Sequence, residues 1–182
     1  MPSTTALFRT LLAPTDWSQL APAVQRIHAE GSVVQASGEA DVDGETHVAA
    51  RLLRRLLSLP EPGPAQPSTI TIERHPTHER WSRQFLRGRM CSTLRAGNDG
   101  LLHERLGPAT LRFALRRDSD AIDWQLRGVR LLGLPLPRAL CGTVLSRSGV
   151  RDRRYAFDID VRLPLLGRLV AYRGWLEIDR VA

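Results

Sequence analysis

Apolar and polar residues alternate with a period of two from Ser68 to the end of the chain. The alternation is clearest at 122–126 and at 155–163, where charged or polar residues separate most of the apolar ones. Successive side chains of a β-strand point to opposite faces, so this pattern is typical of strands with one buried and one solvated face. Turn sequences such as GNDG, RDSD and SRSGVRD separate these runs. The sequence therefore predicts eight to ten consecutive antiparallel strands.

Helical patterns dominate the residues before this region. Thr5 to Leu12 is predicted as a short apolar helix, and a second helix begins near Pro22 and ends at Gly31. We interpret His28, at the end of that helix, as a structural histidine whose hydrogen bonds are satisfied. A weakly alternating strand, interrupted by Gly38, is predicted to follow over 31–42.

A third helix is predicted at 46–57, with arginines on one face. Its other face is apolar and consists of Val48, Ala49, Leu52, Leu53, Leu56 and Leu57. We interpret it as a helix that covers the core and exposes its arginines. A helix that lies on a membrane surface is the alternative.

A sheet of this size with one apolar face must curl, close on itself or wrap around helices. We therefore predict an α+β fold with a large, strongly curved or barrel-like antiparallel sheet of eight to ten strands. About three N-terminal helices are expected to pack against it. A START-like helix-grip fold is the alternative, but it would place a long C-terminal helix where the sequence has the strand-like run LVAYRGWLEID.

Composition argues against several functional classes. The formal net charge is +7, but all 26 basic residues are arginines scattered along the chain with few aromatic residues between them. We therefore expect no nucleic-acid binding. Cys91 and Cys141 lack metal-ligand spacing, and His75 and His78 lack a placed third ligand, so no metal or cofactor is expected. No apolar run has the length of a membrane span or signal peptide, which favours a cytoplasmic protein and leaves peripheral membrane contact open.

Two charged residues occupy positions that the alternation assigns to the buried face. Arg83 falls on the same side as Trp81 and Phe85, and Glu104 on the same side as Leu106. A buried charge requires a partner or water. The two residues therefore form a structural ion pair, reach a cavity, or are turned outward by a bulge.

A cavity with an apolar wall and a few polar groups is the usual form of a small-ligand site. The leading hypothesis is a non-enzymatic or accessory domain that holds an apolar small molecule or a lipid inside the sheet. Arg83 and Glu104 would be its polar anchors, and Arg83 could hold a carboxylate or phosphate. The predicted apolar lining is Trp81, Phe85, Leu106, Phe113, Trp124 and Phe157.

A cyclase or isomerase that uses Glu104 as general acid or base is the enzymatic alternative. It requires Glu104 to face an open pocket. An arginine held against Glu104 would argue against this role, because a neighbouring cation favours the ionised carboxylate.

Two turns, at 131–137 and 163–167, are rich in leucine and proline, whereas ordinary turns are polar. Pro135 and Pro137 cannot donate hydrogen bonds to a sheet, so the chain is expected to leave the sheet near Gly133. The two loops either cap the end of the sheet or form an exposed apolar rim. A rim would contact a partner protein, a membrane or a lipid.

The runs ERWSRQF, LLHERLGPATLRFAL, LRGVRLLGLPLPRAL and YAFDIDVRLPLLGRLVAYRGWLEI resemble a bacterial family of domains of unknown function, number 4166. The resemblance covers Leu20 to Ile178. It implies a single domain over 1–182, with a helical extension at 1–19 and the family core at 20–180. Members often follow NAD(P)-binding domains of the saccharopine-dehydrogenase or epimerase type. The resemblance therefore implies a third function, binding of a partner NAD(P)-dependent oxidoreductase through the leucine–proline rim and the arginine face of helix 46–57.

Overall fold

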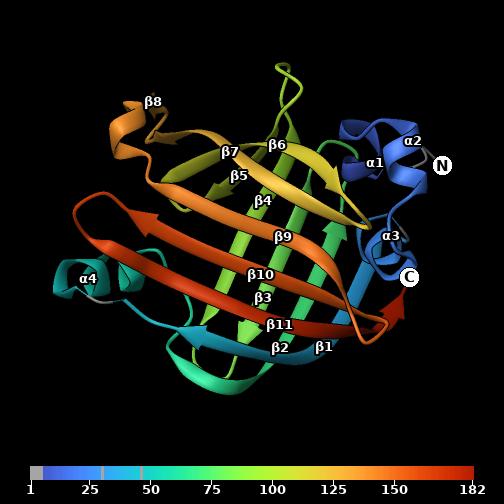
Figure 1. The fold of residues 1–182 in the computed structure, drawn as a ribbon, viewed down its shortest axis with the longest axis horizontal. Coiled ribbons are helices and arrows are strands. Elements are labelled where there is room, and N and C mark those ends of the chain that lie inside the picture. The colour runs from blue at the N-terminus through green and yellow to red at the C-terminus, as the bar shows by residue number, and fades with distance from the viewer. Residues whose placement is uncertain (1–5, 30, 46) are drawn as a thin grey trace.

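The fold is a closed antiparallel β-barrel with helices at both ends (Figure 1). The computed structural model describes residues 6–29, 31–45 and 47–182. Thr5 and Thr46, where two of the predicted helices begin, lie outside the described residues. The helices are α1 (Leu7–Leu11), α2 (Pro14–Ser18), α3 (Pro22–Ala29), α4 (Val48–Leu56) and the short 3₁₀ helix η1 (Arg138–Leu140).

Ten strands form the barrel wall, and a two-residue strand, β8, is attached to it. The strands are β1 (Val33–Asp43), β2 (Gly63–Arg74), β3 (Glu79–Phe85), β4 (Arg89–Ala96), β5 (Leu102–Leu106), β6 (Ala109–Asp118), β7 (Ala121–Leu131), β8 (Leu134–Pro135), β9 (Thr143–Arg151), β10 (Arg154–Leu163) and β11 (Gly167–Val181). Each wall strand pairs with its sequence neighbours, and β11 closes the barrel by pairing with β1. The predicted fold class is confirmed.

The N-terminal helices α1–α3 plug one end of the barrel, and α4 lies at the other end, between β1 and β2 (Figure 1). Phe8, Val24 and Ile27 of the plug join one core cluster with inward-facing strand residues such as Ile72 and Leu102. The separate helix α2 was not predicted. Pro14 occupies the first turn of α2, where proline is tolerated.

Helix α4 does not cover the core in the way that the sequence predicted. Its buried residues are Ala50 and Arg54, whereas Val48, Leu52 and Leu56 are 75%, 71% and 72% exposed. Arg54 is buried because its guanidinium donates to Glu45 Oε2 (2.9 Å) and to the carbonyl oxygen of Pro60 (3.2 Å). The ion pair and the carbonyl bonds thus rotate the apolar face of the helix toward solvent.

The leucine–proline segment after β7 forms an exposed rim. The chain turns back at Leu132 and Gly133, so that Leu134 pairs with Leu131 instead of leaving the sheet. Leu132 and Leu134 are exposed, and Leu165 in the β10–β11 turn is 97% exposed. Of the two alternatives left open by the sequence, the structure supports the rim over the cap.

The plug is attached to the barrel by a buried ion pair. Arg74 Nε, at the end of β2, lies 3.3 Å from Glu79 Oε1, at the start of β3, and both side chains are almost fully buried. The Arg74 guanidinium also donates to the carbonyl oxygens of Ile27 (2.7 Å) and Gly31 (3.0 Å). Carbonyl groups at the C-terminal end of a helix have no hydrogen-bond partner within the helix. Glu79 accepts a hydrogen bond from Trp81 Nε1 (2.9 Å). One residue pair therefore joins α3 to the β2–β3 hairpin.

His28 is buried in the plug, and the interpretation that its hydrogen bonds are satisfied was wrong. Neither ring nitrogen has a hydrogen-bond partner among the described residues. The ring packs instead against Phe8 (centroids 4.0 Å apart), Trp81 (5.6 Å) and Tyr155 (5.7 Å). Burial, with a smaller contribution from the Arg74 charge, lowers the pKa of His28 to about 3. The imidazole is therefore neutral and serves as an aromatic packing residue.

Gly38 and Gly174 allow the closing strands β1 and β11 to approach closely. A Cβ on Gly38 would collide with the carbonyl oxygen of Trp175, and one on Gly174 with the carbonyl oxygen of Glu39. The predicted interruption of the strand at Gly38 is therefore not a break, because β1 runs through it.

We expect Gly38→Ala to lower the free energy of unfolding by about 1–3 kcal/mol, the usual cost of overpacking. Gly128→Ala is the matched control, since a Cβ there would meet only Arg112 Nη1, at 3.9 Å. Urea denaturation of the two variants measures the difference. Equal stability of the two variants would show that the close approach of β1 and β11 does not constrain position 38 sterically.

Candidate functional site

The barrel encloses a cavity of about 100 Å³ between the plug and the α4 end. Side chains from every wall strand except β1 line it, at alternating positions as the period of two requires. All the residues proposed from the sequence are among them: Trp81, Arg83, Phe85, Glu104, Leu106, Phe113, Trp124 and Phe157. The closed barrel brings these eight residues together, although the first and last of them, Trp81 and Phe157, are 76 positions apart in the chain.

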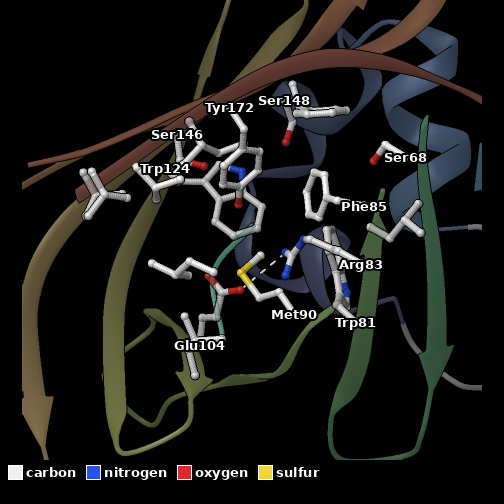
Figure 2. A pocket seen from close by; sticks show the side chains of 18 of the residues that line it. Ser68, Trp81, Arg83, Phe85, Met90, Glu104, Trp124, Ser146, Ser148 and Tyr172 are labelled. Carbon is white, nitrogen blue, oxygen red and sulfur yellow. Dashed lines mark hydrogen bonds and ion pairs between the residues drawn. The ribbon is translucent and has the colours of Figure 1, made fainter. Parts of the chain in front are cut away.

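Arg83 and Glu104 face each other across the cavity, as Figure 2 shows. Arg83 Nη2 lies 3.4 Å from Glu104 Oε1, and the two side chains are 12% and 15% exposed. Arg83 Nη1 also donates to Ser92 Oγ (3.0 Å), and the guanidinium lies over the Trp81 ring, 4.9 Å from its centroid. The alternation thus placed both charges correctly, and they form an ion pair on the wall of a cavity. Glu104 therefore lies against a cation instead of facing the cavity alone.

Trp124 contributes a buried donor that finds no acceptor among the described residues. Its side chain lines the cavity, and its Nε1 makes no hydrogen bond to any described residue. A buried N–H without an acceptor is costly, and a bound water or ligand can supply the acceptor. Trp124 was predicted only as apolar lining, so its polar edge is a feature that the tertiary structure adds.

Tyr155, Tyr172 and Ser148 add polar groups to the cavity beside Ser68, Thr69 and Ser146, and the sequence analysis did not select them. Tyr155 donates to Ser148 Oγ (2.9 Å), and burial raises its pKa to about 12. Tyr172 packs against Phe85 and Phe157, and burial raises its pKa to about 12 as well. Tyr155 and Tyr172 occupy inward positions of β10 and β11, so the same alternation that selected Phe157 could have found them.

Residues 20–176 match the family described as Domain of unknown function (DUF4166). The chain belongs to this family. The resemblance expected from Leu20 to Ile178 is thereby confirmed. No curated protein matches the chain.

The wall of this DUF4166 domain is split between β7 and β9. These strands pair only at Ile122 with Ser148 and at Asp123 with Arg147, and then diverge toward the α4 end (Figure 1). An outer hollow of about 530 Å³ begins at the split and extends over residues of β9, β10, β11 and β1. The hollow and the inner cavity share Trp124, Val144, Ser146 and Tyr172. We call this opening the β7–β9 slit, and the Trp124 side chain contributes to both the cavity and the outer hollow.

Two other properties of this DUF4166 domain bear on its chemistry. Within the described residues, no three histidine, cysteine, aspartate or glutamate side chains are grouped so that they could hold a metal ion. His75 and His78 stack on each other, with centroids 4.6 Å apart. None of the helices in the described ranges is both long and apolar enough to cross a membrane.

Proposed function

We propose that this DUF4166 domain binds a small, uncharged, apolar molecule that carries one hydrogen-bond acceptor. The observation that carries the proposal is the cavity, whose largely aromatic and aliphatic wall includes Trp124, with a buried N–H that makes no hydrogen bond to a described residue. An acceptor on the ligand would satisfy this donor, and the ligand's apolar body would contact the aromatic lining.

The charges of the cavity favour a neutral ligand. Arg83 already lies against Glu104, so the two formal charges cancel. A carboxylate ligand would add a second negative charge beside Glu104 in a poorly solvated space, which is unfavourable. The proposal therefore keeps the apolar ligand expected from the sequence. It drops the expectation that Arg83 holds a carboxylate or phosphate of that ligand.

The volume of the cavity limits the size of the ligand. A space of about 100 Å³ is close to the roughly 150 Å³ of an engineered cavity that binds benzene, and well below the pockets of drug-sized ligands. We infer a body of five or six heavy atoms, with the β7–β9 slit as the route of entry. A longer chain would fit only if part of it lay in the slit.

The proposal predicts that cyclopentanone, a compact molecule with one carbonyl acceptor, binds in the cavity. In ¹H–¹⁵N NMR spectra we expect a saturable downfield shift of the Trp124 indole resonance. Cyclopentane should bind about ten-fold more weakly, because one hydrogen bond to an otherwise unsatisfied donor is lost. Butyrate, an anion of similar size, should bind more weakly than cyclopentanone.

Trp124→Phe keeps a ring in the wall but removes the donor, so it should abolish the preference for cyclopentanone over cyclopentane. Trp175→Phe is the matched control, because Trp175 lies outside the cavity lining, beneath Arg154. Ser146→Phe at the slit should slow or block binding of both probes. If neither probe gives a saturable shift, or if butyrate binds best, the proposal is wrong.

A further inference from the structure

Exposed leucines are concentrated at one end of the barrel. Of the eleven large hydrophobic side chains that are exposed in the described part of the chain, only Val181 lies at the plugged end. Leu145 lies near the start of β9. The other nine are on α4 or on segments that join strands at the same end: Val48, Leu52, Leu56, Leu86, Leu131, Leu132, Leu134, Leu140 and Leu165. A monomer rarely exposes so many apolar side chains on one surface unless that surface binds something.

These segments form one surface, which we call the α4 end and define as residues 43–45, 47–62, 86–89, 105–109, 130–143 and 162–168. In Figure 1, α4, the β10–β11 turn and the β8–η1 segment project from the same side of the barrel. Two backbone hydrogen bonds hold the remaining turns to them. Glu61 N donates to the Arg87 carbonyl (3.2 Å), and Leu132 N donates to the Pro108 carbonyl (2.9 Å).

The α4 end is also the positively charged end of the molecule. Its segments contain ten arginines and three carboxylates. Asp160, just outside these segments, pairs with two of the arginines, Arg162 and Arg168. The three carboxylates are already paired: Glu45 with Arg51 and Arg54, Glu61 with Arg87, and Asp43 with Arg168 and Arg173. Among the described residues, no carboxylate lies within ion-pair distance of Arg55, Arg89, Arg130 or Arg138.

We propose that the α4 end docks on the surface of an anionic lipid bilayer. The arginines supply attraction to the negatively charged headgroups, and the protruding leucines insert among the lipids beneath them. Charge complementarity favours this occupant over a second copy of the chain, since two α4 ends brought face to face would each carry the same positive excess. The apolar residues project from separate turns instead of lining one groove, which also suits a bilayer. The inference is independent of the proposed ligand.

The direct test is co-sedimentation of the purified full chain with vesicles. We expect binding to phosphatidylcholine vesicles that contain about 30% phosphatidylserine, and at least about ten-fold weaker binding to pure phosphatidylcholine vesicles. Raising the salt concentration from about 0.1 M to 0.5 M should weaken the binding by a similar factor, because the headgroup attraction is screened.

Paired variants separate the two contributions. Leu52→Asn combined with Leu165→Asn should reduce binding about ten-fold or more, whereas Val181→Asn, at the plugged end, should leave it unchanged. Arg55→Gln combined with Arg138→Gln should reduce binding and its salt dependence. Arg153→Gln combined with Arg180→Gln changes the net charge equally at the plugged end and should have little effect.

Circular dichroism and thermal unfolding would establish that each variant is folded, and all these substitutions are at exposed positions. The inference is overturned if the protein ignores anionic vesicles, or if it binds both vesicle types equally. It is also overturned if the α4-end variants bind like their plugged-end controls. Analytical ultracentrifugation that shows concentration-dependent dimers, abolished by the leucine substitutions, would identify a second copy as the occupant instead.

Discussion

Replacing Arg74 with methionine is expected to lower the free energy of unfolding by about 3–5 kcal/mol at pH 7, the usual cost of removing one partner of a buried ion pair. The variant keeps most of the side-chain volume but leaves Glu79 buried without this cation. It also removes the donors to the Ile27 and Gly31 carbonyls at the end of α3. Chemical denaturation, monitored by tryptophan fluorescence, measures the loss.

The matched control is Arg80→Met, because Arg80 belongs to the same hairpin and pairs with Glu73 at 3.9 Å in solvent. An exposed pair of this kind contributes only about 0–1 kcal/mol. Burial raises the pKa of Glu79, and the Arg74 charge opposes that shift. The loss in free energy of unfolding caused by Arg74→Met should therefore become smaller as the pH falls, because protonation of Glu79 removes the uncompensated charge. A deficit below about 1 kcal/mol at pH 7 would show that the ion pair does not hold the plug.

Acidification is expected to destabilise the protein through His28. Its pKa is about 3 in the folded state and 6.5 in the unfolded chain, so between these values only the unfolded state binds the proton. The stabilisation is therefore complete above pH 6.5 and is lost as the pH falls toward 3. A shift of this size corresponds to a loss of the order of 4–5 kcal/mol.

His28→Leu isolates this contribution, since leucine fills a similar volume and does not titrate. The stability difference between wild type and His28→Leu should change by several kcal/mol between pH 7 and pH 4, in favour of the variant at low pH. His75→Leu, at an exposed turn, should keep the pH dependence of the wild type. If His28→Leu follows the wild-type curve at every pH, then His28 is not the titrating group.

Alternation along single strands was sufficient to predict much of the barrel and of its lining. It predicted the antiparallel strands, and it placed Arg83 and Glu104 on the inner face beside Trp81 and Leu106. The residues that it missed, Tyr155 and Tyr172, obey the same rule but were not selected as lining. The expected oxidoreductase partner and cytoplasmic location stay predictions.

The orientation of α4 shows why a local pattern can mislead. The sequence determines that the helix has an apolar face and an arginine face, but not which face meets the barrel. Glu45 and the carbonyl of Pro60 hold Arg54 in a buried position, and these contacts turn Leu52 and Leu56 outward. The stabilisation from these contacts outweighs that from burying two leucines. The contacts come from residues that precede and follow the helix in the chain.

The sequence by itself thus determined the period, the strands and the faces on which side chains lie, because these follow from the local geometry of the backbone. Only the tertiary structure decided that β11 closes on β1, that β7 and β9 part at a slit, and that Trp124 Nε1 has no acceptor among the described residues. It also decided that the leucine–proline loops at 131–137 and 163–167 join α4 as an exposed rim. Each of these features depends on distances between residues far apart in the chain, which no local pattern specifies.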